Sequence, residues 1–212
     1  MKIRILLLLV ILASSCTKKA LKLPKSHTKA STEVLNNSNI WIFYTLKGQD
    51  TVATLNRNNS ISTTNWLYNI DRRLQLKHLY KPLKKILAKR QKKSPHHVEG
   101  MKNYFSFADT LDKHNKFLEF KLKDILYKKP LLNDTTHVVF QFYKTQFKLN
   151  DASFNYAQFD SVIKLKKMAF KEGVQFYYKD NLSYDTYLNI KISLHNYPFL
   201  KGLENTTDFY FK

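Results

Sequence analysis

The sequence predicts a single α+β domain with a mixed, largely antiparallel, aromatic-rich sheet and three to four helices, preceded by a signal peptide and a flexible tether. Of the 212 residues, 43% are hydrophobic and 14% aromatic, which is typical of a chain that folds. Runs of alternating aromatic residues indicate amphipathic strands, and apolar residues at helical spacing separate these runs. The single cysteine excludes an internal disulfide, so the core alone must hold the fold.

The first sixteen residues have the order of a secretory signal. Lys2 and Arg4 precede an uninterrupted apolar run, Ile5 to Leu12, and the small residues 13–15 follow it. This run is far shorter than the roughly 20 residues that span a bilayer. We therefore expect residues 1–15 to be removed and the mature chain to begin at Cys16.

The segment Ala13-Ser14-Ser15-Cys16 resembles the lipobox of bacterial lipoproteins. The family favours Leu three positions before the cysteine, where this chain has Ala13, and Leu12 lies one position earlier. The resemblance implies cleavage before Cys16, a diacylglyceryl group on its thiol, and further acylation (palmitate) of its amino group. Two or more acyl chains hold a protein firmly at a membrane. An ordinary signal peptide cut at the same bond is the alternative.

The residues after Cys16 bear on location and on where folding begins. Lys18 and Lys19 follow closely and no acidic residue precedes Glu33, which favours the periplasm-facing side of an outer membrane in a bacterial cell envelope. Residues 16–38 are rich in Lys, Ser, Thr and Asn and show no periodicity, so we expect a lipidated tether there. The globular domain is expected over 39–212.

The domain is expected to open with a hairpin and a helix. Two β-rich runs, 40–46 and 51–55, flank turn residues at 47–50. Beyond a Ser/Thr cap near 62–64, apolar residues at 66, 67, 70 and 74 have helical spacing and predict a helix.

A basic amphipathic helix is expected over 77–93. Leu79, Leu83, Ile86 and Leu87 share one face, and the other face carries lysine and arginine with no acid. Such a helix either has a solvated outer face or lies on an anionic surface, where each basic residue contributes about 1 kcal/mol. The residues expected to contact an anionic surface are Lys84, Lys85, Lys89, Arg90, Lys92 and Lys93.

The remaining elements follow the same two periodicities. We expect strands at 101–110, 115–122, 174–180 and 206–212, and one long strand or a pair of strands at 137–149. Helices are expected at 156–171 and 183–197, the last opened by Ser183. Residues 103–110 and 174–181 both alternate aromatics and end near an aspartate, which reflects either a duplicated helix–strand unit or chance.

Residues 137–212 resemble the periplasmic domain of biopolymer transport proteins of the ExbD type. In that family a strand, an aspartate and, a few residues on, a tyrosine precede a helix, and Asp180 with Tyr184 or Tyr187 match this pattern. The resemblance implies an envelope-protein fold. The chain departs from the family in lacking a transmembrane helix with a buried aspartate, so no proton-channel role is expected.

The net charge of +20 predicts a polyanionic partner, such as nucleic acid, anionic lipid or lipopolysaccharide phosphates. An export signal argues against nucleic acid, and the sequence has no signature of an RNA- or DNA-binding module. The expected partners are therefore a membrane, through covalent lipid and anionic headgroups, and an envelope protein.

Motifs for catalysis are absent from the sequence, including G-x-S-x-G, H-E-x-x-H and the Walker loop. His96-His97, with Asp109 and His114 downstream, is the most metal-like feature. Adjacent loop histidines point in different directions, so solvated histidines are the favoured interpretation. We expect no catalytic residues, no metal and no cofactor.

The carboxylate pairs Asp109/Asp112 and Asp180/Asp185 fall at strand ends and turn starts, where aspartate acts as a cap. The expected function is a non-enzymatic structural or binding component at a membrane surface. The alternatives are a periplasmic component of a transport or energy-transducing complex, and an envelope hydrolase that uses Asp109, Asp180 or the histidine pair.

Overall fold

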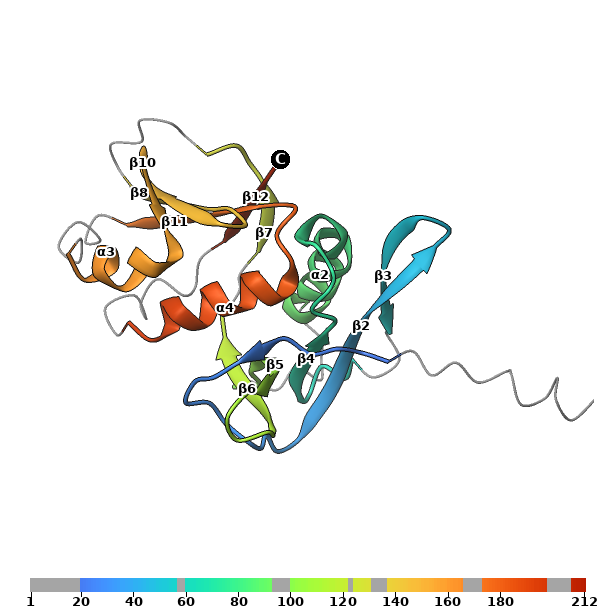
Figure 1. The fold of residues 1–212 in the computed structure, drawn as a ribbon. Helices are drawn as coiled ribbons and strands as arrows, with labels where there is room; N and C mark the ends of the chain where they lie inside the picture. Colours follow the sequence, from blue (N-terminus) through green and yellow to red (C-terminus); the bar gives the residue numbers. More distant parts are fainter. Residues whose placement is uncertain are drawn as a thin grey trace, which may run out of the picture.

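The computed structural model describes residues 20–56, 60–92, 100–121, 124–130, 137–165, 173–197 and 207–212. Two mixed sheets enclose a layer that contains two helices (Figure 1). The α+β single-domain prediction is thereby confirmed.

The first sheet has the strand order β1-β5-β4-β2-β3, with β6 also paired to β5. Strands β1, β5, β4 and β2 run parallel, while β3 and β6 are antiparallel to their neighbours. The bounds are β1 Lys25–Ser26, β2 Asn37–Lys47, β3 Asp50–Asn56, β4 Asn65–Ile70, β5 Asn103–Asp109 and β6 Asn115–Phe120, and helix α2, Leu76–Gln91, follows β4.

The second sheet has the order β10-β9-β8-β11-β12-β7. Strands β8, β11, β12 and β7 run parallel, and the β8–β9–β10 meander is antiparallel. The bounds are β7 Ile125–Tyr127, β8 Val138–Phe142, β9 Gln146–Leu149, β10 Ala152–Asn155, the 3-10 turn η1 Tyr156–Gln158, α3 Phe159–Leu165, β11 Val174–Lys179, α4 Tyr184–His195 and β12 Asp208–Phe211.

The same topology occurs twice in the chain. The order β3-β2-β4-β5 in the first sheet matches β9-β8-β11-β12 in the second, with the same strand directions. In each unit a helix follows the middle strand: α2 follows β4, and α4 follows β11. The second unit adds β10, η1 and α3 between its hairpin and its middle strand.

A local two-fold relation joins the two units. The residues that precede the two helices, Gln75 and Ser183, form an isolated antiparallel bridge with each other. The backbone hydrogen bonds around the bridge occur in pairs that exchange under this two-fold: Leu76 N to Leu182 O (2.9 Å) with Tyr184 N to Leu74 O (2.7 Å), and Lys77 N to Asp180 O (2.8 Å) with Asp185 N to Arg72 O (3.3 Å). The relation therefore extends over both strand–helix junctions.

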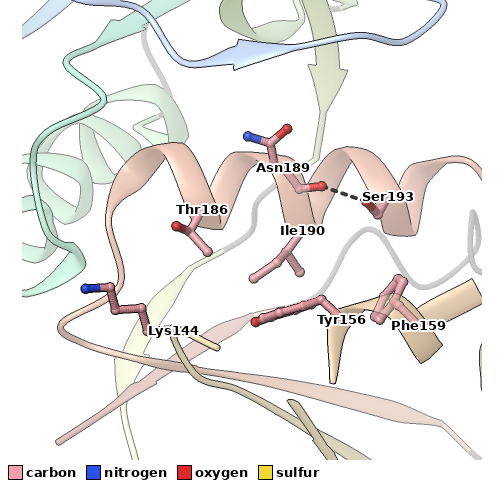
Figure 2. Close-up of a pocket in the computed structure, with 7 residues that line it drawn as sticks. All are labelled: Lys144, Tyr156, Phe159, Thr186, Asn189, Ile190 and Ser193. Carbon is pink, nitrogen blue, oxygen red and sulfur yellow. Dashed lines mark hydrogen bonds between the residues drawn. The ribbon is translucent and has the colours of Figure 1, made fainter. Parts of the chain in front are cut away.

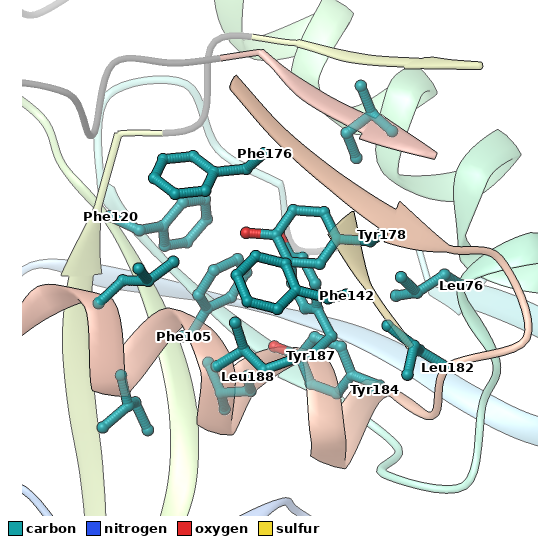
Figure 3. Close-up of a cluster of buried hydrophobic side chains, with 14 of the residues drawn as sticks. Leu76, Phe105, Phe120, Phe142, Phe176, Tyr178, Leu182, Tyr184, Tyr187 and Leu188 are labelled. Atoms are coloured by element: carbon teal, nitrogen blue, oxygen red, sulfur yellow. The ribbon is translucent and has the colours of Figure 1, made fainter. Parts of the chain in front are cut away.

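One aromatic core joins the two sheets (Figure 3). Phe105 of β5 stacks on Phe120 of β6, with ring centroids 3.5 Å apart. Tyr187 of α4 meets Phe105 edge-on at 6.4 Å and Tyr178 of β11 at 4.9 Å, so this helix packs against both sheets. Because aromatic side chains bury large areas, this layer supplies much of the hydrophobic stabilisation.

The helix predicted near residues 62–74 is wrong. Residues 65–70 form β4, the central strand, and five of its six residues are buried. A strand covered on both faces reads as a continuous apolar run, and such a run is easily taken for a helix. The basic helix itself is confirmed, with Leu76 as its first residue and Leu79, Leu83, Ile86 and Leu87 buried.

The expectation of a largely antiparallel sheet is also wrong, because parallel pairings outnumber antiparallel ones among the described strands. The helical crossovers β4–α2–β5 and β11–α4–β12 require parallel neighbours.

The described part of the expected tether, residues 20–38, is packed against the domain rather than free. Ser26 and Val34 are buried, and Lys25–Ser26 pairs with β5. The backbone N–H of Lys22 donates to the carboxylate of Asp71 at 3.2 Å. The short β1 supplies pairing that no periodicity in the sequence reveals.

Candidate functional site

A groove of about 490 Å³ lies between α2 and the β2–β3 hairpin. Its volume lies within the range of small-molecule and cofactor pockets. One wall is the helix, and the other is strand β3, the outer edge of the first sheet. The described lining residues are Thr45, Lys47, Val52, Ala53, Thr54, Leu55, Lys81, Pro82 and Lys85.

The groove is cationic. Lys47, Lys81 and Lys85 are exposed, and among the described residues none of them forms an ion pair. Lys81 and Lys85 are one helical turn apart, so their ammonium groups lie on the same face. The described lining includes no aspartate or glutamate. Uncompensated positive charge in a concave surface attracts and concentrates anions.

The hairpin that forms the outer wall is set by its turn. Gly48 has a φ of +60°, which glycine adopts without strain, and Lys47 pairs with Asp50 across a two-residue loop. Thr54 donates to Thr45 Oγ1 at 3.2 Å on the strand face. Val52, Ala53 and Leu55 are half-buried and contribute apolar surface between the lysines.

The second unit has an equivalent groove of about 270 Å³ (Figure 2). Counting along the helices from the Gln75–Ser183 bridge, Lys81 corresponds to Asn189, Pro82 to Ile190 and Lys85 to Ser193. All six residues line their respective grooves, so the local two-fold relates the grooves as well as the strands. The second groove is lined by Lys144, Tyr156, Phe159, Thr186, Asn189, Ile190 and Ser193.

The two grooves differ in what they offer a ligand. In Figure 2, Tyr156 and Phe159 lie beneath α4 and face Ile190. The polar side chains of α4 there bond within the chain: Asn189 Nδ2 donates to Lys25 O and Asp185 O, and Ser193 Oγ donates to Asn189 O. Tyr156 of η1 and Phe159 of α3 line this smaller groove, which has one exposed lysine, Lys144, whereas the groove in the first unit has three.

The predicted anionic-contact residues divide into two groups. Lys85 of α2 and Lys92, directly after the helix, are exposed, and Lys84 is half-buried with its Nζ 3.5 Å from Tyr80 Oη. Lys89 Nζ donates to Ser60 O at 2.8 Å and so ties the helix to the loop before β4. Cys16 and Lys93 lie outside the described residues, as do His96 and His97.

Arg90 is a structural residue. Its guanidinium lies 4.6 Å from the ring centroid of Trp66 and donates to Ser62 O and Thr64 O at 3.0 Å and to Lys102 O at 3.3 Å. Burial lowers the pKa of Arg90, and the nearby Tyr68 opposes that change. Sequence reasoning placed Arg90 with the surface lysines because its position on the helix carries no mark of these loop carbonyls.

Asp109 closes the β5–β6 turn. Its fully buried carboxylate accepts hydrogen bonds from Leu111 N and Asp112 N at 2.8 Å, and from Lys116 Nζ and His27 Nδ1 at 3.0 Å. Burial raises its pKa, but these donors outweigh burial and hold the pKa well below the usual range. The capping role expected for Asp109 is confirmed.

The other chemically interesting acids do not join Asp109. Asp180 accepts from Tyr127 Oη at 3.3 Å, and Asp185 accepts from Lys25 N at 3.0 Å. His114 contributes its backbone carbonyl to Asp109 N. Within the described ranges no three metal-ligating side chains come together.

A buried polar group that sequence reasoning missed is Asp208, at the start of β12. Tyr187 Oη donates to it at 2.5 Å and Lys191 Nζ at 3.1 Å. Burial, followed by the charge of Asp208, raises the pKa of Tyr187 well above its ordinary value. The helical spacing of Tyr187 and Lys191 in the sequence was the available signal for a shared partner.

Comparison with protein-family models, curated proteins and solved structures gives no match for this chain. Among the residues described, no helix has both the length and the apolar character needed to span a membrane.

Proposed function

We propose that this protein is a non-enzymatic binding component of a bacterial cell envelope, held at a membrane by lipid on Cys16, and that the α2–β3 groove binds anionic groups. The observation that carries the proposal is the groove itself: three exposed lysines, with no ion pair among the described residues, line a concave surface that has apolar patches and no acid. The short apolar run before the small residues and Cys16 supports the anchor.

The lipid anchor would strengthen anion binding by the groove. A lipid anchor keeps the domain near the membrane, so a weak anion site operates at high effective concentration. Each lysine near an anionic surface adds about 1 kcal/mol. Lys47, Lys81 and Lys85 together therefore suffice for orientation, although alone they support only weak binding.

Binding tests the groove. Fluorescein-labelled poly-L-glutamate, followed by anisotropy, and phosphatidylglycerol vesicles, followed by co-sedimentation, present anionic groups from two sources. The triple variant Lys47→Gln/Lys81→Gln/Lys85→Gln should lose most binding to at least one of them. The control carries Lys29→Gln/Lys113→Gln/Lys121→Gln, three exposed lysines around β6 at the opposite edge of the sheet. Equal losses in both variants would reduce the effect to net charge and refute the site.

Mass spectrometry of the mature amino terminus tests the anchor. The expected product begins with a diacylglyceryl Cys16, and Cys16→Ala should release the protein from membranes. A free thiol on Cys16 would disprove the anchor while leaving the groove to be judged on its own.

A second candidate is a component of an envelope transport complex. The resemblance of residues 137–212 to ExbD-type periplasmic domains supports this role. The elements follow in the order β8–β9–β10, α3, β11, α4 and β12, Asp180 lies directly after β11, and Tyr184 is the first residue of α4. A single stoichiometric partner recovered by cross-linking the anchored protein in membranes would favour this role.

A further inference from the structure

We propose that the groove accepts an extended acidic segment of a partner protein, which adds as a further strand to the free edge of β3. This inference rests on the proposed function, because it names the anionic partner of the same groove. Three independent features of the chain lead to it: the free backbone of β3, the occupied edge of the equivalent strand β9, and the charge around the groove.

The first feature is the backbone of β3. Lys47 pairs with Asp50 around the two-residue turn, so the pairs Thr45–Val52 and Phe43–Thr54 exchange the hydrogen bonds of the hairpin. The N–H and C=O groups of the alternate residues then point to the outer edge of the sheet, where no described strand pairs with β3. These residues are Thr51, Ala53 and Leu55.

This edge also lacks the features that usually protect one. Natural edge strands carry inward charges, prolines or bulges that block pairing. Between Asp50 and Asn56, β3 reads Thr-Val-Ala-Thr-Leu, which is uncharged and rich in β-formers. The groove therefore exposes a pairing template beside α2.

The second feature is the local two-fold. Strand β9 has the same place in the second unit as β3 has in the first. Strand β3 pairs antiparallel with β2, and β9 pairs antiparallel with β8. On β9 that outer edge is occupied by β10, which pairs antiparallel over residues 152–155. The same chain thus shows that this position in the unit accepts an additional strand.

The third feature is charge, which selects the occupant. A strand laid along β3 passes Lys47, Lys81 and Lys85, so acidic side chains on it meet three exposed cations. A second copy of this chain is disfavoured, because pairing β3 with β3 brings these lysines together on molecules that stay strongly cationic: the full chain carries +20, and loss of Lys2 and Arg4 with the signal peptide leaves 20 − 2 = +18. Main-chain pairing with side-chain pockets is an established way of binding extended peptides.

The test uses a short fluorescein-labelled peptide in which Glu alternates with Val and Thr, and a second peptide of identical sequence whose alternate backbone nitrogens are methylated. Methylation removes the strand donors and keeps the charge. We expect the plain peptide to bind and methylation to weaken binding about tenfold or more, because two to three net hydrogen bonds are lost. Hydrogen exchange should show new protection at Ala53 and Leu55 in the complex.

Ala53→Pro provides a second test on the protein side. It removes an outward-pointing donor and leaves the hairpin's own pairs in place, as proline does on edge strands. We expect Ala53→Pro to weaken binding of the plain peptide more than binding of the methylated peptide, which has already lost its strand donors. Circular dichroism verifies the fold of this variant, and the methylated peptide keeps the proposal testable if the variant unfolds.

The outcomes separate the two proposals. Equal binding of both peptides, or binding of poly-L-glutamate or vesicles without either peptide, overturns strand addition and leaves the anionic groove standing. If none of these probes responds to the groove lysines, both proposals fail. Dimers that dissociate on Ala53→Pro in light scattering would also overturn the inference, since they assign the edge to a second copy.

Discussion

Replacing Arg90 should lower the free energy of unfolding and leave the binding of anions unchanged. Its guanidinium holds three loop carbonyls and covers the ring of Trp66. Net contributions are about 1.5–3 kcal/mol for hydrogen bonds to a charged group and about 0.5–1 kcal/mol for a partly exposed cation–π contact. Because two of these hydrogen bonds are part-buried and the third is exposed, water replaces part of them, and we expect Arg90→Ala to cost about 3 kcal/mol.

Urea denaturation followed by tryptophan fluorescence measures this cost. With a slope of about 2 kcal/mol per molar urea, the midpoint should fall by about 1.5 M. Lys85→Ala, an exposed change on the same helix, should move the midpoint by less than about 0.25 M, since surface substitutions stay within about 0.5 kcal/mol. A midpoint unchanged by Arg90→Ala, or weakened binding of poly-L-glutamate by Arg90→Lys in a fully folded protein, would refute the structural role.

Two further predictions concern buried polar groups. Tyr187→Phe should destabilise the fold by about 1–3 kcal/mol in the same assay, because it takes a donor from the buried Asp208. Tyr184→Phe is the matched control, since the buried Tyr184 hydroxyl has no hydrogen-bond partner among the described residues. An equal loss of stability in both variants would contradict the reasoning. The pKa of Asp109 is lowered in the folded state, so its contribution is present above the unfolded value of about 3.9 and is lost as the pH falls below it. Asp109→Asn should flatten the acid limb of stability against pH, and an unchanged limb would show that Asp109 does not set it.

Local signals in the sequence predict much of the fold. The β2–β3 hairpin follows from two β-rich runs around Gly48, and α2 from four buried residues at helical spacing. Ser183 caps α4 by accepting from Thr186 N, as its position before the helix predicts. Each of these elements depends on contacts within one segment.

The failures concern contacts made at long range. Strand β4 is buried on both faces by neighbours from other parts of the chain, so its apolar run carries no alternation. The pairing of Lys25–Ser26 with β5 depends on partners about eighty residues away. In the sequence Arg90 has the pattern of a surface cation, because the loop carbonyls that it binds belong to other segments of the chain.

The repeat shows why the grooves escaped sequence reasoning. The echo between residues 103–110 and 174–181 compares β5 with β11, yet the topology matches β5 to β12 and β4 to β11. Residues at equivalent positions in the two units are both buried but differ in type. Tyr68, which pairs with Phe105, corresponds to Phe176, which pairs with Asp208. Once that match is made, the difference between the units becomes a functional argument. The second unit fills its sheet edge with β10 and its groove with η1 and α3, whereas in the first unit the described residues leave the same edge open beside exposed lysines. The second unit thus closes with its own chain the position that we propose a partner strand takes in the first unit.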